Sequence, residues 1–200
     1  MTIYKRSGLL LPLLAIPALA GCVSFGGKPP KQLLTLTADQ RVAAGTTISR
    51  EPGISISVFD PEAPKKLDTV RIPVQADATS IAYVQDVQWV DTPRHLFQKL
   101  LSETIAASGK TLVLDPGEYS IDPGRRLLGE LVDFGIDARS GQAIVTYDAI
   151  LTAPNGATIS KRRFSASEPV GSIKAETVGA PLSRAANKVA AEVAAWISEN

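Results

Sequence analysis

The sequence predicts a single α+β domain, in which an antiparallel or mixed β-sheet packs against two amphipathic helices. Residues 54–58 alternate apolar and polar side chains with the period of two that is typical of a strand. Residues 92–109 and 180–197 instead carry apolar side chains at spacings of three and four, as amphipathic helices do. Between these two helices, residues 128–166 contain three long strand-like segments separated by turn residues.

Short strands fill the first half of the predicted domain. Leu34 and Leu36 alternate with threonines from about Leu33, and Ile56 and Val58 alternate with serines. The same alternation recurs in three further segments, residues 70–74, 81–84 and 87–90. Because proline cannot donate a ladder hydrogen bond, Pro73 indicates a sheet edge or a strand end.

The first helix has clear start and stop signals. Thr92 is a capping residue followed by Pro93, which suits the first helical position. Gly109 stands where a left-handed residue ends a helix. Its predicted apolar stripe consists of Leu96, Phe97, Leu100, Leu101 and Ile105. We expect residues 111–114 to return to the sheet as a strand.

Three strands and a second helix complete the domain. We expect strands at 128–138, 143–152 and 158–166, joined by turns at 139–141 and 154–156. The alanine-rich helix is predicted from about Ala180 and has one apolar face. That face carries Leu182, Ala185, Ala186, Val189, Val193, Trp196 and Ile197.

Composition excludes several classes of protein. The chain has 200 residues, 44% of them hydrophobic, and a formal net charge of +1. These values are typical of one globular domain, and they argue against a disordered or polytopic membrane protein. Because the charges are balanced, we expect no nucleic-acid partner.

The N-terminus predicts export and lipidation. Lys5 and Arg6 precede the apolar run 9–19, as in a secretory signal peptide. The run ends in Leu19-Ala20-Gly21-Cys22, which resembles the lipobox of bacterial lipoproteins. We therefore expect a signal peptide over 1–21 and acyl groups on Cys22. The alternative is an ordinary signal peptide, cut near Ala20, with an unrelated cysteine.

Lipidation also accounts for the cysteine content. Cys22 is the only cysteine, so no intramolecular disulfide is possible. Several acyl chains would hold the protein durably at a membrane. Val23 stands where an aspartate would signal inner-membrane retention, so we expect the periplasmic leaflet of the outer membrane. Residues 22–32, rich in glycine and proline, are predicted to be a flexible tether, followed by the folded domain 33–200.

The search for catalytic chemistry finds little. Gly109-Lys110-Thr111 resembles a P-loop end, but it follows a helix and lacks the upstream glycine. His95, the only histidine, is interpreted as a surface or partly packed residue of the first helix. Asp115 with Glu118 and Asp133 with Asp137 are interpreted as surface charge. We therefore expect no enzymatic activity, no cofactor and no metal site.

Two further features have competing interpretations. The basic stretch Lys161-Arg162-Arg163 is interpreted as part of a solvated edge strand that is protected by charge. The less favoured interpretation is a contact with acidic lipid headgroups or with a partner. Trp89 and Trp196 belong to apolar faces, so we expect both in the core.

An ordered set of short segments resembles the ABC-type transport auxiliary lipoprotein component family, an Mce-associated family. The resemblance spans nearly the whole chain after the lipobox. Its segments are Thr35-Leu36, Leu67-Asp68, Ile72-Pro73-Val74, Tyr83, Trp89 before Pro93, Leu131-Val132-Asp133-Phe134, Arg163-Phe164, Glu168-Pro169-Val170 and Ala195-Trp196-Ile197. Leu33-Leu34 departs from the pattern, which has an aromatic residue there.

The resemblance implies a function as well as a fold. It implies a non-catalytic accessory subunit that works with an Mce-domain protein and an ABC permease/ATPase complex, or a related membrane complex, in lipid transport between membranes. Cys22 is the one functional residue it transfers. A homo-oligomer and a monomer fit the sequence equally. The alternative function is a stand-alone structural lipoprotein of outer-membrane assembly or cell-wall contact.

Overall fold

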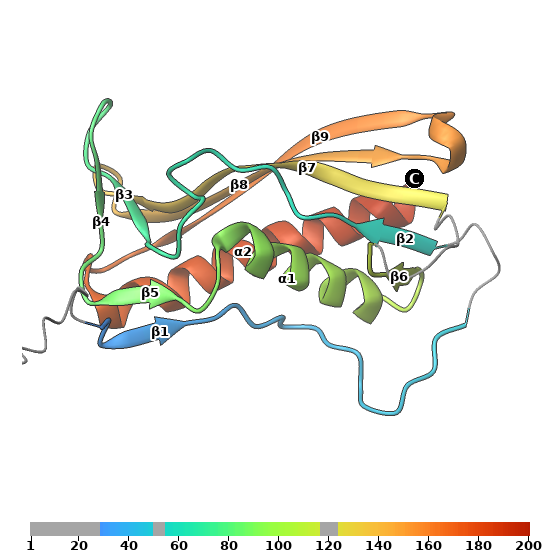
Figure 1. Cartoon of the computed structure of the whole chain (residues 1–200), viewed down its shortest axis with the longest axis horizontal. Coiled ribbons are helices and arrows are strands. Elements are labelled where there is room, and N and C mark those ends of the chain that lie inside the picture. The colour runs from blue at the N-terminus through green and yellow to red at the C-terminus, as the bar shows by residue number, and fades with distance from the viewer. Residues whose placement is uncertain (1–28, 50–54, 117–123) are drawn as a thin grey trace, which may run out of the picture.

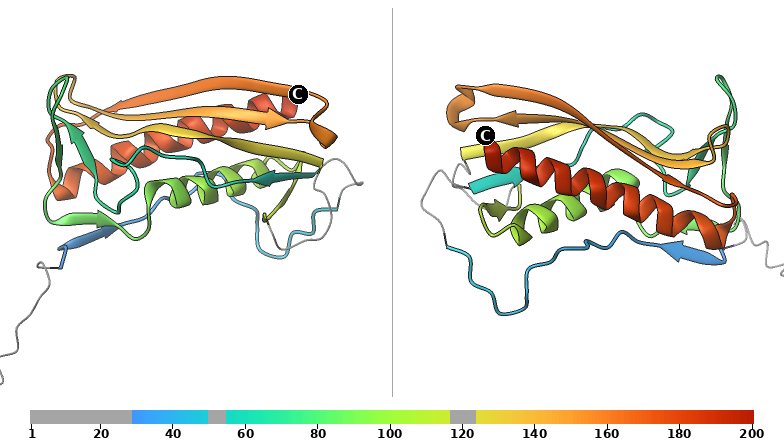
Figure 2. Two further views of the ribbon diagram at one scale, coloured as in Figure 1. Left: turned by 45° about the horizontal axis from the view of Figure 1, so that its top comes forward. Right: turned by 180° about the vertical axis from the view of Figure 1, so that it is seen from behind.

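The computed structural model describes residues 29–49, 55–116 and 124–200. Within these ranges, seven strands form one mixed sheet, and two further strands form a separate parallel pair (Figure 1). Two α-helices cover one face of the larger sheet (Figure 2). This arrangement confirms the predicted α+β class.

The elements follow the predicted order. The strands are β1 (Gln32–Leu34), β2 (Ser55–Val58), β3 (Pro73–Gln75), β4 (Ile81–Tyr83), β5 (Val87–Trp89), β6 (Leu112–Leu114), β7 (Gly124–Asp137), β8 (Gln142–Thr152) and β9 (Ile159–Pro169). The helices are α1 (Pro93–Ala107), the short 3-10 turn η1 (Pro154–Gly156) and α2 (Ala175–Glu199).

β7 is the central strand of the larger sheet. One edge of β7 pairs antiparallel with β8, which pairs in turn with β9. On its other edge, β2 pairs parallel with the start of β7, and β3 pairs parallel with its end. β4 and β6 extend the sheet beyond β3 and β2. Pro73 is the first residue of β3, so its predicted position at a strand end is confirmed.

Helix α1 begins and ends as predicted. Thr92 is its N-cap and Pro93 its first residue, although the Thr92 side chain makes no capping bond. The backbone of Gly109, just past the end, is left-handed with φ of +67°. The predicted apolar stripe of α1 is buried. α1 packs against α2, and α2 lies across β8 and β9.

A chain of aromatic rings connects α1 with three strands. The ring of Trp89 on β5 lies 5.5 Å from that of Phe134 on β7, between centroids. Phe97 of α1 contacts both Phe134, at 6.4 Å, and Tyr147 of β8, at 5.3 Å. All three contacts have the edge-to-face geometry that aromatic pairs prefer. Both tryptophans are buried, as predicted: Trp196 of α2 packs on Phe164.

Gly129 makes room for the buried ring of Tyr147. The Tyr147 hydroxyl donates a hydrogen bond to the carbonyl oxygen of Leu128, 2.9 Å away across the β7–β8 ladder. A Cβ atom at Gly129 would lie 2.8 Å from the Tyr147 ring and 2.1 Å from the carbonyl oxygen of Asp148. Only glycine fits here, because both strands are held in register by the ladder on either side.

Several strand predictions need correction. β3 spans 73–75 rather than 70–74, and β9 extends to Pro169 rather than ending at 166. β1 ends at Leu34, so Leu36 lies outside it, because the chain then leaves β5 and follows the helices. Ser55 and Ser57 are buried rather than solvent-facing, since β2 lies between β7 and β6. β7 starts at Gly124, four residues before the predicted Leu128, because its first residues pair with β2.

Helix α2 starts earlier than predicted. It begins at Ala175 rather than near Ala180, which places Pro181 inside the helix. Proline there removes one helical hydrogen bond. Val178 and Leu182, on either side of Pro181, are fully buried, and Leu34 of β1 packs on Gly179. Tertiary burial of this first turn compensates for the missing bond.

The segment after β1 is fixed to both helices by polar side chains, one of them, Asn187, buried. Asn187 of α2 accepts a hydrogen bond from the N–H of Asp39, at 2.9 Å, and donates one to the carbonyl of Thr37, at 3.0 Å. Glu103 of α1 accepts one from the N–H of Val42, at 2.9 Å. The polar Asn187 thus replaces backbone partners that a strand would have supplied.

Ion pairs attach β9 to its neighbours. Arg163 donates two hydrogen bonds to Asp148 of β8, one of 2.8 Å from Nη2, and this bidentate contact lowers the pKa of Asp148. Glu168 accepts hydrogen bonds from Lys188 and Arg184 of α2, the latter at 2.9 Å. These bonds lower the pKa of Glu168.

We predict that Gly129→Ala lowers the free energy of unfolding by about 2–3 kcal/mol, because the added methyl group overlaps a backbone carbonyl and a buried ring. Urea denaturation measures the loss. Gly171→Ala is the matched control, since no atom lies within 4 Å of a Cβ there. Equal stability of the two variants would contradict the packing described for β7 and β8.

We also predict acid sensitivity from Asp148 and Glu168. Their native pKa values are lowered, so both ion pairs stabilise the native state at neutral pH. This contribution is lost as the pH falls below about 4, the usual range of carboxyl groups, and through the lowered native pKa values. Urea denaturation at a series of pH values follows this loss.

Arg163→Gln separates this effect from general acid denaturation. The variant should be less stable than the wild type at pH 7, and the two stability curves should converge in acid, where Asp148 is protonated in both. Lys110→Gln is the control, because it removes an exposed cation that has no carboxylate partner among the described residues. A constant offset of Arg163→Gln at every pH would contradict the assignment.

Candidate functional site

The predicted lipid-attachment residue, Cys22, lies outside the described residues. The described chain enters the folded body at a fixed point. The N–H groups of Lys31 and Gln32 donate hydrogen bonds to the carbonyl of Asp86, at 2.9 and 3.1 Å. Lys31 Nζ also pairs with the Asp86 carboxylate at 2.8 Å. β1 therefore starts at one end of the long axis of the molecule (Figure 1).

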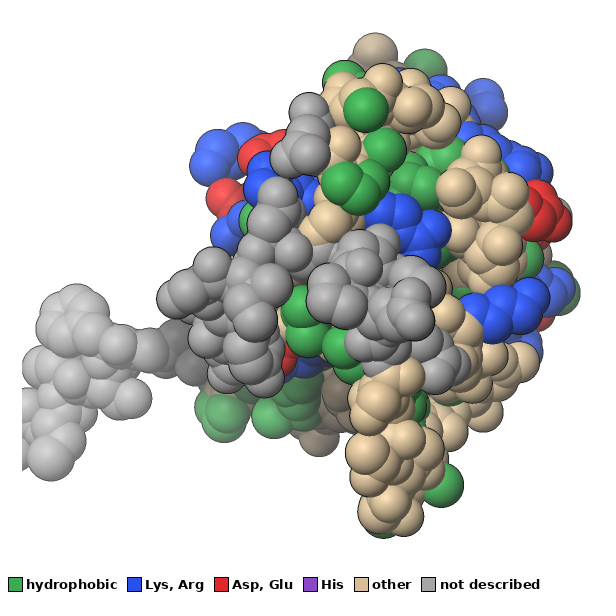
Figure 3. Space-filling model, turned by 90° about the vertical axis from the view of Figure 1, so that its right-hand side faces the viewer, with side chains coloured by type: hydrophobic (Ala, Val, Ile, Leu, Met, Phe, Trp, Pro, Cys, Tyr) green, Lys and Arg blue, Asp and Glu red, His purple; other side chains and the backbone are tan. Residues whose placement is uncertain are grey.

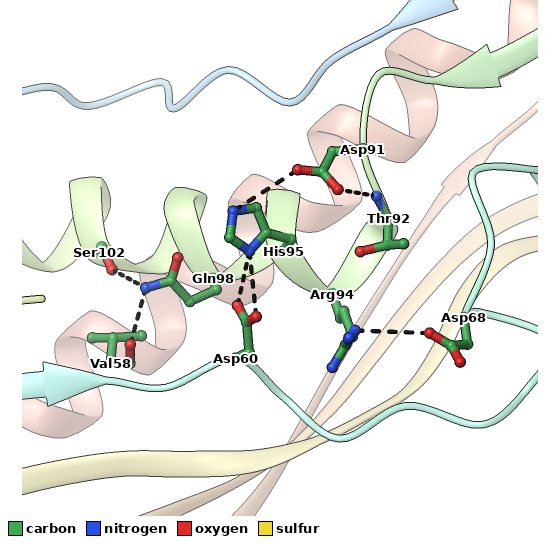
Figure 4. Close-up of polar contacts among 9 residues, drawn as sticks. All are labelled: Val58, Asp60, Asp68, Asp91, Thr92, Arg94, His95, Gln98 and Ser102. Carbon is green, nitrogen blue, oxygen red and sulfur yellow. Dashed lines mark hydrogen bonds and ion pairs between the residues drawn. The ribbon is translucent and has the colours of Figure 1, made fainter. Parts of the chain in front are cut away.

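His95 lies between two carboxylates at the start of α1 (Figure 4). Its Nδ1 atom is 3.2 Å from Asp60, and its Nε2 atom is 3.8 Å from Asp91. Asp91 also accepts a hydrogen bond of 2.7 Å from the N–H of Thr92. The imidazole is partly exposed, which confirms the interpretation of His95 as a surface or partly packed residue.

The polar neighbours of His95 connect α1 to the sheet and its loops. Gln98 donates a hydrogen bond of 2.9 Å to the carbonyl of Val58, at the end of β2. Arg94 lies 3.9 Å from Asp68, which also binds Lys65 at 3.1 Å. No group of three or more histidine, cysteine or acidic residues in the described part of the chain could hold a metal ion.

A small recess opens on the face of the sheet away from the helices. It has a volume of about 200 Å³ and is lined by Pro73, Asp133, Gly135 and Asp137, among others. The ladder shifts register between Leu131 and Asp133, and bulges of this kind often mark functional positions. Its volume is nevertheless below the ~300–1,000 Å³ of typical ligand pockets.

The recess lies where two segments of the family resemblance meet, 72–74 and 131–134. Gly135 permits this contact, because a Cβ atom there would lie 2.6 Å from the carbonyl oxygen of Pro73. Lys66 forms an ion pair with Asp133 at the rim. These residues thus hold β3 against β7, and sequence reasoning missed this role of Asp133 and Lys66.

The acidic pairs from the sequence have separate structural roles. Asp137 accepts hydrogen bonds from the N–H of Arg139, at 2.9 Å, and the hydroxyl of Ser140, at 3.0 Å. These bonds close the β7–β8 turn and lower the pKa of Asp137. Asp133 pairs with Lys66 instead, so the two aspartates, which both line the recess, have different partners. Glu118 lies outside the described residues.

The basic stretch 161–163 lies on the sheet edge. β9 pairs with β8 alone, and its three cations are exposed, which confirms the predicted charged edge strand. Lys161 and Arg163 point to one face, toward Asp148, whereas Arg162 lies over the Phe164 ring at 5.0 Å. Lysine and arginine side chains are spread over this end of the molecule (Figure 3).

None of the helices in the described part of the chain is long and apolar enough to cross a membrane. The described polar residues fix strands, turns and helix ends, and no nucleophile is paired with a base at His95.

Solved structures share this fold. Protein XCC0632 from Xanthomonas campestris, described as a DUF330 protein, aligns with a TM-score of 0.70 at 17% identity, covering 84% of this chain and 95% of its own. A second, uncharacterized protein aligns with a TM-score of 0.60 at 12% identity, covering 85% of this chain and 97% of its own. At these identities the likeness concerns the fold alone. No curated protein matches the sequence.

The structural likeness does not assign the chain to a family, but a family model does. The model of the ABC-type transport auxiliary lipoprotein component matches residues 34–194, which span the folded body from the last residue of β1 into α2. All the segments quoted for the resemblance lie in this range except Ala195-Trp196-Ile197, which follows it directly. The chain belongs to the ABC-type transport auxiliary lipoprotein component family.

Proposed function

We propose that this protein is a lipid-anchored, non-catalytic accessory subunit of an Mce/ABC-type system that moves lipid between bacterial membranes. One observation carries the proposal: the family match begins at residue 34, and the lipobox ends at Cys22, shortly before it. An auxiliary lipoprotein of a transporter needs a membrane anchor beside a folded body that binds partners. In this chain the lipobox comes shortly before the folded body, so the acylated cysteine would be an anchor beside a body that binds partners.

The anchor is acyl groups on Cys22, with 1–21 removed as a signal peptide. The predicted tether, 22–32, ends where Lys31 and Gln32 bind Asp86. Two or three acyl chains bind a bilayer durably, whereas one chain binds only reversibly. Because Val23 is not an aspartate, the protein is sorted to the periplasmic leaflet of the outer membrane. The folded body, 33–200, then stays beside its partners at that membrane.

The partners are an Mce-domain protein and an ABC permease/ATPase complex, or a related membrane complex. The family supports a transport partner. The absence of a paired nucleophile and base at His95 supports a binding role over a catalytic one. Self-association of the body is compatible with this role, and nucleic acid has no part in it.

We predict that the full-length, lipidated protein recovers Mce or permease components when it is purified from detergent-solubilised membranes. Cys22→Ser is the matched control: without acyl groups it should leave the outer-membrane fraction and recover these components far less well. Mass spectrometry of the mature N-terminus checks acylation directly. Recovery of only outer-membrane assembly or cell-wall components would favour the alternative, a stand-alone structural lipoprotein.

We predict that His95→Ala retains the transport function, scored as the barrier to a membrane-impermeant dye in a deletion strain that expresses the variant. The imidazole makes only partly exposed contacts with Asp60 and Asp91, which contribute about 1 kcal/mol or less to stability. Loss of the barrier at normal protein levels would instead assign His95 a chemical role.

A further inference from the structure

Exposed apolar side chains gather at the end of the molecule where β1 starts. We define this β1 end as β1, β4, the residues from β5 to Val90, and residues 171–174 ahead of α2. Among the described residues, five large hydrophobic side chains are exposed, and four of them lie here. The four are Leu33 (60% exposed), Ile81 (44%), Val90 (54%) and Ile173 (39%).

These elements form one end of the body. β1, β4, β5 and the start of α2 lie together in all three ribbon views (Figures 1 and 2). Leu33 and Gln88 are partners in the β1–β5 ladder, and the strand alternation puts Val90 on the same face as Gln88. Ile173 lines an open groove of about 420 Å³ with Tyr83 of β4.

The chain leaves the body at this same end. Lys31 is held to Asp86 by backbone and side-chain contacts, so the exit point is fixed. Cys22 stands nine residues before Lys31, which gives the intervening chain a reach of at most about 30 Å. The body is longer than this, because α2 alone, with 25 residues, spans about 37 Å. An anchor at Cys22 therefore keeps the β1 end within reach of the bilayer.

We propose that the β1 end rests on the surface of the bilayer that holds the anchor, with Leu33, Val90 and Ile173 inserted among the lipid headgroups. This inference rests on the proposed acylation of Cys22. The transfer of apolar side chains from water to the boundary of the acyl chains is favourable, because it removes apolar surface from water. The exposed Lys174 lies beside Ile173 and can extend its ammonium group to lipid phosphates.

At the opposite end, one of the described residues is a large exposed hydrophobic residue. This residue, Ile159, lies on the β8–β9 hairpin near the exposed cations of 161–163. In this orientation the molecule stands on its β1 end, and the hairpin projects away from the anchoring membrane. The basic edge of β9 is then presented to partners in the periplasm.

The test places a fluorescent reporter at each end of the full-length, lipidated protein. Ile173→Cys and Ile159→Cys are matched, since both replace an exposed isoleucine. With Cys22 acylated, the introduced cysteine is the only free thiol. Each variant is reconstituted into phosphatidylethanolamine/phosphatidylglycerol vesicles that contain a lipid with a nitroxide on its acyl chain, which quenches a dye only in close contact.

We expect quenching at position 173 to exceed that at 159 several-fold, although Ile159 is the more exposed residue. Adding Leu33→Asn and Val90→Asn to the 173 reporter should remove most of the quenching, whereas Ile159→Asn should leave it unchanged. Equal quenching at 173 and 159, or no effect of the two asparagines, would overturn the inference. A missing acyl group on Cys22 gives a different result: the chain without an introduced cysteine would then itself react with the thiol dye.

Discussion

The structure depends on the buried contact of Phe97 with Phe134 and Tyr147. These three rings, with Trp89, come from two parts of the chain: β5 and α1 follow one another, as do β7 and β8, but the two pairs of elements are distant in the sequence. Burying a ring of this size contributes about 1.5–3 kcal/mol, and edge-to-face pairing adds to it. The gain exceeds the cost of leaving the indole N–H of Trp89 without a partner among the described residues. Once α1 is fixed in this way, α2 has a helix and a sheet to pack on.

Polar side chains in this body are used mostly to hold elements together. Asn187 and Glu103 fix the segment after β1, Gln98 fixes the end of β2, and Asp148 and Glu168 fix β9. The ion pairs of Asp148 and Glu168 lower the pKa of both carboxyl groups, which makes them poor proton acceptors for catalysis. This division of roles suits a subunit that acts by being held in one place and by contacting partners.

The two ends of the body differ in chemistry, and the difference follows from the course of the chain. Among the described residues, four of the five large exposed hydrophobic side chains lie at the end that receives the N-terminal segment, whereas the hairpin end has Ile159 beside the cations of 161–163. An anchored protein with identical ends would hang from its tether in many orientations. In the proposed anchored state, the difference between the ends favours one orientation and so determines which surface faces the proposed partners.

Local patterns in the sequence determined the element order, the limits of α1 and the hairpins of β7 to β9, because periodicity, Pro93 and Gly109 act within a few residues. The predicted lipobox, with Cys22, was likewise identified from the sequence alone, because it lies outside the described residues. The start of α2 at Ala175, the burial of Ser55 and Ser57 and the shortness of β1 were decided by tertiary packing. Tertiary packing also decided the ion-pair partners of Asp133 and Asp148. It likewise brought the exposed side chains of Leu33, Val90 and Ile173 to one end of the body. In each case the deciding contacts join residues distant in the sequence, and no local pattern carries that information.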